Sequence, residues 1–137
     1  MNRNTLATVS PLLVQPRVSR DTKSRQMAEL SLGVVEALRG ASITWEQARH
    51  DLFNLDNYLQ AKKLRLHPKL IEAFEWAMEM EDVAALAPAS LGQSFDRVVA
   101  LLRQVMREAG PRDHPKGQPG HWVEEVEVPN TGHPYFK

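Results

Sequence analysis

The sequence predicts a mainly α-helical fold, a compact bundle of about five helices, and three observations lead to this prediction. The chain has 137 residues, which is the length of one ordinary domain. Its residues are 42% hydrophobic and 25% charged, as in globular proteins that bury a core. Between residues 21 and 110, apolar residues recur every three or four positions. We therefore divide the chain into an extended segment (1–20), a helical domain (21–110) and a Pro- and Gly-rich tail (111–137).

The first helix is predicted over residues 22–39. In the segment before it, Thr, Val and Leu alternate with two prolines, which favours extended backbone and one short edge strand. Asp21 can cap the helix, and Gly40 suits its end. Gly33 lies inside the helix and costs about 1 kcal/mol relative to alanine. Either another helix crosses closely at Gly33 or the helix tolerates this cost, and we expect the close crossing.

Two short helices are predicted next. Thr44 and Gln47 have the spacing of a capping box, in which each side chain accepts a hydrogen bond from a backbone donor of the helix start. A helix therefore begins directly after Thr44. Asn54 or Asp56 can cap a second short helix that ends near Lys63.

The fourth helix is predicted from His67 and Pro68 to about Glu81, because proline suits the first position of a helix. One further turn follows and is interrupted at Pro88.

The strongest amphipathic pattern follows and predicts a helix over residues 88–108 that ends before Gly110. In the tail beyond it, the run from Trp122 to Val128 favours one short β-strand.

Composition argues against several classes of function. The net charge is zero, because 17 Lys and Arg residues balance 17 Asp and Glu residues, so we expect no nucleic-acid partner. No apolar run approaches the ~20 residues that cross a bilayer, and we expect no membrane partner. The chain has no cysteine and starts without a signal-peptide pattern, so we expect a cytoplasmic protein.

We predict no metal and no cofactor. No two of the five histidines have the spacing of a zinc site. These histidines are His50, His67, His114, His121 and His133. The sequence also lacks a nucleophile elbow, a metalloprotease motif and a nucleotide-binding fingerprint, so no catalytic residue is assigned.

Four carboxylates follow one another at three- and four-residue steps on the helix that begins at Pro68. We call Glu72, Glu75, Glu79 and Asp82 the acidic row. Such a row is ordinarily a solvated face, and its functional alternative is a surface that binds a partner. Trp76 lies beside the row and is a candidate anchor for another protein.

Basic residues concentrate before and after the acidic row. They are Lys62, Lys63, Arg65 and Lys69 on one side, and Arg97, Arg103 and Arg107 on the other. We interpret them as surface residues that favour solubility and can balance the acidic row.

A set of capping and packing residues carries a family resemblance. These residues are Ile43, Thr44, Glu46, Ala48, Leu52 and Phe53, followed by Glu79, Glu81, Asp82, Val83 and Leu86. The pattern resembles a small family of uncharacterised bacterial helical proteins and covers roughly residues 27–106. The resemblance implies a helical fold in the bacterial cytoplasm and names no catalytic residue.

Three functional hypotheses remain. The first is a non-enzymatic protein-binding module, such as an immunity- or antitoxin-like inhibitor or an accessory subunit, that uses the acidic row and Trp76. The second is an enzyme or metal-dependent protein in which carboxylates of the row and a histidine such as His50 form a site. The carboxylates in question are Glu75, Glu79 and Asp82. The third is a homodimeric structural protein whose strand over residues 122–128 pairs across a two-fold axis.

Overall fold

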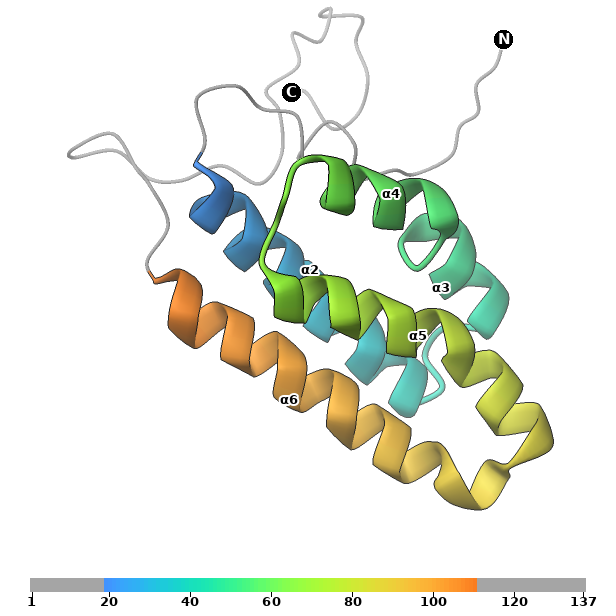
Figure 1. The fold of residues 1–137 in the computed structure, drawn as a ribbon. Coiled ribbons are helices and arrows are strands. Elements are labelled where there is room, and N and C mark those ends of the chain that lie inside the picture. The colour runs from blue at the N-terminus through green and yellow to red at the C-terminus, as the bar shows by residue number, and fades with distance from the viewer. Residues whose placement is uncertain (1–18, 111–137) are drawn as a thin grey trace, which may run out of the picture.

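The structure is a computed structural model, and it describes residues 19–110 (Figure 1). Its elements are α2 (Arg20–Arg39), α3 (Trp45–Asp51), α4 (Leu55–Lys63), α5 (Pro68–Leu86), the 3-10 turn η1 (Pro88–Ser90) and α6 (Leu91–Ala109). Over these residues the fold is a helical bundle without strands, which confirms the mainly α prediction. The strands predicted near the N-terminus and over residues 122–128 lie outside the described residues.

The three long helices form the body of the bundle. Helices α5 and α6 run antiparallel, joined by the η1 turn, and α2 lies behind them in Figure 1 and packs along α6. The shorter helices α3 and α4 form a second layer on the side of α5 that faces away from α6. Helix α5 therefore lies in the middle of the molecule and presents its outer surface beside α4.

Aromatic side chains join the short helices to the long ones. Phe53, in the connection between α3 and α4, meets Phe74 of α5 edge to face, with ring centroids 5.2 Å apart. Trp45 of α3 stacks on Phe95 of α6 at 6.0 Å. Of the apolar positions predicted for the last helix, Leu91 is half-buried, and the others are buried: Phe95, Val98, Leu102 and Val105. The amphipathic pattern of that helix is therefore the face that packs on α2 and α5.

Helix α2 begins two residues earlier than predicted. Ser19, not Asp21, is the N-cap residue, and its hydroxyl accepts a hydrogen bond from the Thr22 backbone N–H at 3.1 Å. Both residue types can cap a helix, and the earlier one satisfies the first donors here. Asp21 instead lies in the first turn, where its carboxylate interacts favourably with the positive end of the helix dipole.

The predicted starts of α3, α4 and α5 are confirmed. Thr44 and Gln47 form both bonds of the capping box, at 3.0 and 2.9 Å. Asn54, the first of the two candidates, caps α4 and accepts a backbone N–H of the first turn at 2.9 Å. At the start of α5, the ring Nδ1 of His67 accepts the Lys69 N–H at 3.0 Å. Side chains therefore satisfy backbone donors at each of these starts.

The expectation of a close helix crossing at Gly33 is wrong. Gly33 is exposed, and a Cβ atom built there meets nothing within 4 Å apart from its own helix. The buried stripe of α2 contains Met27, Val35 and Leu38, which lie on the opposite side of the helix. Gly33 therefore faces away from the core, and its cost to the helix is tolerated.

The end of α2 differs from the prediction in one detail. Gly40 is the C-cap, as expected, but its φ is −84°. The left-handed residue is the next one, Ala41, with a φ of 59°. The Ala41 N–H donates to Leu38 O at 3.0 Å, and the Ser42 N–H donates to Ala37 O at 2.8 Å. This pair of bonds is a Schellman motif, which usually has glycine at the left-handed position.

Helices α5 and α6 end close to their predicted limits. Helix α5 continues through Leu86 before Pro88 opens the η1 turn, so α6 proper starts at Leu91, three residues later than predicted. Gly110 follows α6 with a φ of 76°, a conformation that favours glycine, and this confirms the predicted stop.

A single arginine ties the end of α6 to α2. The Arg25 guanidinium donates to the carbonyl oxygens of Met106 and Gly110, at 2.6 and 3.0 Å. Carbonyl groups at the end of a helix have no partner within the helix, so this side chain supplies one. His67 also contacts Glu108 at 2.6 Å, which joins the start of α5 to the end of α6. These contacts therefore fasten the end of α6 to the starts of α2 and α5.

Candidate functional site

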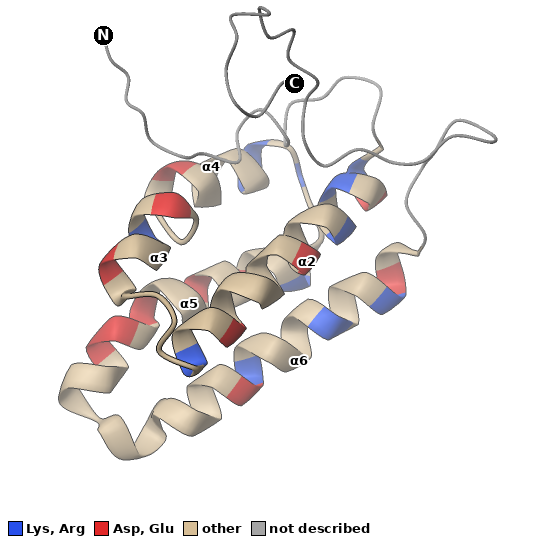
Figure 2. Ribbon diagram, turned by 180° about the vertical axis from the view of Figure 1, so that it is seen from behind, with Lys and Arg blue, Asp and Glu red and all other residues tan. Residues whose placement is uncertain are grey.

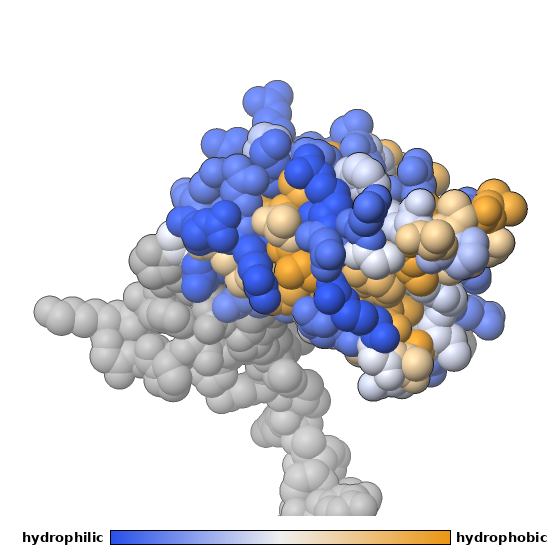
Figure 3. Space-filling view, turned by 90° about the horizontal axis from the view of Figure 1, so that it is seen from below, coloured by the Kyte–Doolittle hydropathy of each residue, from blue (hydrophilic) through white to orange (hydrophobic). Residues whose placement is uncertain are grey.

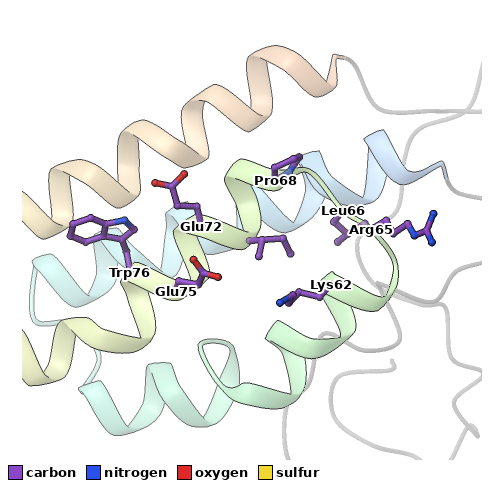
Figure 4. A pocket seen from close by; sticks show the side chains of 8 residues that line it. Lys62, Arg65, Leu66, Pro68, Glu72, Glu75 and Trp76 are labelled. Carbon is purple, nitrogen blue, oxygen red and sulfur yellow. The ribbon is translucent and has the colours of Figure 1, made fainter.

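A groove of about 680 Å³ lies between α4, the α4–α5 connection and the outer face of α5 (Figure 4). We call it the α4–α5 groove. Its lining residues are Lys62, Arg65, Leu66, Pro68, Ile71, Glu72, Glu75 and Trp76. Three of the five predicted site residues are among them, namely Glu72, Glu75 and Trp76. Part of the acidic row therefore lines a groove, and the basic residues Lys62 and Arg65 line the same groove.

Two basic residues, Lys62 and Arg65, line the groove on the side of α4 and the α4–α5 connection. In Figure 4, Lys62 reaches from α4 toward α5, and Arg65 extends outward from the connection at the far end from Trp76. The Lys62 ammonium lies 5.3 Å from the ring centroid of Tyr58, within range of a cation–π interaction. Within residues 19–110, neither Lys62 nor Arg65 forms an ion pair, but Lys62 faces the same tyrosine whose hydroxyl donates to Glu75.

Arg65 has an unusual backbone. Its φ is 55°, in the left-handed region of backbone conformation that residues other than glycine rarely adopt. It ends α4 in a Schellman motif, in which Arg65 N–H donates to Lys62 O at 3.0 Å and Leu66 N–H donates to Ala61 O at 3.1 Å. Glycine would suit this position better, yet the chain places a long cation there.

The middle of the groove is apolar. Leu66 is buried beneath it, Ile71 is half-buried and Pro68 is exposed at the start of α5. These side chains carry no hydrogen-bonding groups, so a ligand over them gains by removing apolar surface from water.

Glu72, the first carboxylate of the acidic row, is already paired. Arg97 of α6 lies 2.7 Å from Glu72, and Lys69 lies 3.5 Å away. The hydrogen bond from Arg97 lowers the pKa of Glu72 below its ordinary value, against a smaller opposing effect of burial. Glu72 therefore links α5 to α6, and its charge is largely neutralised within the protein.

Glu75 and Trp76 line the groove from α5. A Glu75 carboxylate oxygen accepts a hydrogen bond from the Tyr58 hydroxyl at 2.6 Å, and this bond raises the pKa of Tyr58. Trp76 is 39% exposed, which is high for so large an apolar side chain. Glu79 shares a smaller hollow of about 200 Å³ with Glu75 and Trp76. The acidic charge beside Trp76 thus comes from Glu75 and Glu79.

Asp82, the last predicted site residue, lines neither of these two hollows. It is exposed near the end of α5 and forms no ion pair within the part of the chain that the structure describes. Its neighbour Glu81 pairs with Arg49 of α3. The structure therefore groups four of the five predicted residues and leaves Asp82 beyond them.

Charged residues separate in part by sign along the bundle, although the chain is neutral overall and carboxylates such as Asp21 and Glu108 lie among the cations of one end (Figure 2). One end holds the starts of α2 and α5 and the ends of α4 and α6, and we call it the basic end. Its basic residues are Arg20, Lys23, Arg25, Lys62, Lys63, Arg65, Lys69, Arg103 and Arg107. We call the opposite end, with α3 and the end of α5, the acidic end. Its acidic residues are Glu36, Glu46, Asp51, Asp56, Glu79, Glu81, Asp82 and Asp96.

Arginines at the acidic end are paired and do not cancel this separation. Arg39 lies 3.6 Å from Glu36 and 3.5 Å from Asp96. Arg49 pairs with Glu81. The surplus at the acidic end is therefore negative and exposed. The α4–α5 groove runs from the basic end toward this surplus.

The second hypothesis placed a metal or catalytic site at carboxylates of the acidic row and His50. Among residues 19–110, no three His, Asp or Glu side chains come together as a metal ion would require. His50 contacts its neighbour Asp51 at 3.1 Å. None of the helices described there combines the length and apolar character needed to cross a membrane.

A second exposed feature is apolar. Leu86, at the end of α5, is 84% exposed. Figure 3 shows apolar side chains gathered at the end of the molecule where α5 connects to α6. This tip lies at the opposite end of α5 from Arg65, so it is separate from the α4–α5 groove.

Sequence reasoning did not include Lys62 and Arg65 among the binding residues, because it interpreted them as surface residues for solubility. Their position in the sequence could have identified them, because this cluster of cations directly precedes the helix that carries the acidic row. A reversal of direction between two helices brings such neighbours in sequence to one surface.

A comparison with protein families identifies the family of the chain. Residues 19–123 match the family described as "Protein of unknown function (DUF3969)", and the chain belongs to this family. This confirms the resemblance to an uncharacterised family. No curated protein and no solved structure matches the chain.

Proposed function

We propose that this protein is a non-enzymatic protein-binding module, an inhibitor of the immunity or antitoxin type or an accessory subunit. The observation that carries the proposal is the α4–α5 groove, where Glu75 and Trp76 share one hollow with Lys62, Arg65 and the apolar side chains of Leu66 and Ile71. Surfaces with an exposed aromatic anchor and charges around it are typical of protein interfaces. The absence of cysteine favours a reducing compartment, and we place the protein in the bacterial cytoplasm.

The unpaired carboxylates of the acidic row support a role in partner binding better than a role in solubility alone. Glu72 is paired with Arg97 and Lys69, as a structural carboxylate would be. Glu79 has no such partner within the described residues, and Glu75 has only the neutral hydroxyl of Tyr58. Exposed carboxylates beside a tryptophan can pair with a partner's cations while the ring supplies buried apolar area.

The test is affinity capture from the native host with a tagged full-length chain and two matched variants. The first variant is E75K/E79K, which reverses the charge beside Trp76. The second is E46K/D82K, which reverses two exposed carboxylates outside the groove. We expect the first variant to lose a partner that the second retains. A folded E75K/E79K protein that keeps every partner of the unmodified chain would refute the assignment.

A further inference from the structure

The first two turns of α2 are buried on the side that faces away from the core. Thr22 and Gln26 lie four residues apart and share one face of the helix, and only 1% and 7% of their surfaces are exposed. Gly33 lies about two turns after Gln26 on the same face and is exposed. This face is therefore covered at the start of α2 and open two turns later.

The helices within residues 19–110 do not account for this cover. Helices α3, α5 and α6 contact α2, and its buried stripe with Met27 and Val35 faces the core. Figure 2 views the bundle from behind, and none of the described helices lies between the first turns of α2 and the viewer. Threonine and glutamine on such an outer face are ordinarily exposed. Their burial indicates that a further segment of polypeptide lies on this face.

Gln26 also offers this segment a hydrogen-bond acceptor. Its side-chain oxygen Oε1 is buried and accepts no hydrogen bond. A buried acceptor without a donor is costly, because it has lost its hydrogen bonds to water. A segment that lies on this face can supply the missing donor, for example from a backbone N–H group.

The chain that follows α6 begins beside this face. Arg25, the neighbour of Gln26 in α2, donates to the carbonyl oxygen of Gly110 at 3.0 Å. The family match covers residues 19–123, so it starts at the N-cap of α2 and continues 13 residues beyond Gly110. Residues 1–18 lie outside this match. The segment shared with the family is therefore the one that starts next to the covered face.

The length and composition of residues 111–123 suit this role. Thirteen residues of extended chain reach about 40 Å, whereas Thr22 and Gln26 are about 6 Å apart along the helix axis. The segment contains Pro111, Pro115 and Pro119. Each proline has a fixed φ, which lowers the entropy cost of ordering the segment. The segment ends with Trp122 and Val123, which can contribute apolar surface to the contact.

We propose that residues 111–123 fold back from Gly110 onto the outer face of the first two turns of α2. They exclude water from Thr22 and Gln26 and donate a hydrogen bond to Gln26 Oε1. The folded unit is then residues 19–123, the same range as the family match. This inference goes beyond the proposed function, because the surface lies on α2 and not at the α4–α5 groove.

Photo-crosslinking in the full-length chain is the first measurement. A diazirine amino acid replaces Gln26 in one protein and Gly33 in a control, and mass spectrometry identifies the linked peptides. The probe at position 26 should link to residues 111–123 of the same chain, independently of protein concentration, and the probe at position 33 should not. A link to residues 1–18, a link only between two chains, or no link at all would overturn the proposal.

Single-cysteine labelling is the second measurement, and it is clean because the chain contains no cysteine. The reaction rate of a thiol follows its exposure, so Q26C should react at least on the order of tenfold more slowly than G33C. Deleting residues 111–137 should bring the rate of Q26C close to that of G33C. Deleting residues 1–18 or 124–137 should leave Q26C slow.

V35C serves as the control for folding, since Val35 is fully buried in the core. If Q26C stays slow in a truncated chain in which V35C is still unreactive, the cover is not residues 111–137, and the proposal is wrong. If V35C reacts, the truncated chain has not folded, and the crosslink in the full-length chain decides. Neither measurement depends on the groove, so the proposed function is tested separately by the capture experiment on E75K/E79K.

Discussion

Replacing Gly33 by alanine tests the packing of α2 directly. Gly33 lies inside a twenty-residue helix, it is exposed, and an added Cβ would meet nothing within 4 Å apart from its own helix. The substitution therefore creates no steric clash and removes the conformational cost of glycine. Alanine is favoured over glycine inside a helix by about 0.8–1.0 kcal/mol. We expect the free energy of unfolding to rise by about that amount.

Thermal and urea unfolding followed by circular dichroism provide the assay. For a domain of this size, a gain of about 1 kcal/mol corresponds to an increase in melting temperature of about 4–8 °C. Gly92→Ala is the control, because its Cβ position is also open but it lies in the first turn of α6, where the gain should be smaller. A lower melting temperature for Gly33→Ala would mean that another segment covers this face, and the reasoning would then be wrong.

Three further predictions concern the end of α2, the core and the link between α5 and α6. Ala41→Gly should raise the free energy of unfolding by about 0.5–1 kcal/mol in urea titrations, because glycine adopts the left-handed conformation without the strain that alanine has there. A lower free energy of unfolding would contradict this. Phe74→Ala should lower it by about 3–5 kcal/mol, because the ring is fully buried; a loss below about 1 kcal/mol would show that this part of the core is loosely packed. Glu72→Gln should destabilise the protein at pH 7. The lowered pKa of Glu72 means that its contribution to stability is fully present above pH 4.5 and is lost as the pH falls further. The difference in free energy of unfolding between the two proteins should therefore shrink as the pH is lowered below 4.5, and a constant difference would contradict the ion pair.

The helix starts were predictable because their determinants are local. Thr44 and Gln47 lie three residues apart, and the two bonds of their capping box require no other part of the chain. His67 and Pro68 act in the same way at the start of α5. Where two residues that can cap a helix lie close together, as Ser19 and Asp21 do, the sequence pattern predicts the helix but not which residue begins it.

The packing around individual residues was less predictable. Gly33 was expected at a close crossing because glycine is costly in a helix, but whether a helix face is covered depends on the positions of other helices. The left-handed residue after α2 was missed for a similar reason. Gly40 is the residue type that prefers this conformation, yet Ala41 adopts it, since the bonds that end the helix determine which residue must turn.

The candidate site was predicted in part. The acidic row follows from helical spacing alone, and Trp76 follows from its place beside the row. Which carboxylates are available to a partner depends on tertiary structure, because Arg97 lies 25 positions after Glu72 in the sequence and is brought beside it only when α6 packs on α5. Spacing therefore identified the row, and ion pairing distinguishes its structural member from its exposed ones.

Net charge is a poor guide to the interactions of this protein. The chain sums to zero, and a neutral chain has no overall charge with which to attract an ion from a distance. Charges on the folded protein are not evenly mixed, however, since arginines at the acidic end, such as Arg39 and Arg49, are paired with neighbouring carboxylates. What remains is a partial separation into a basic end and an acidic end. A partner with complementary charges should therefore orient as it approaches, and its association should slow as added salt screens both ends.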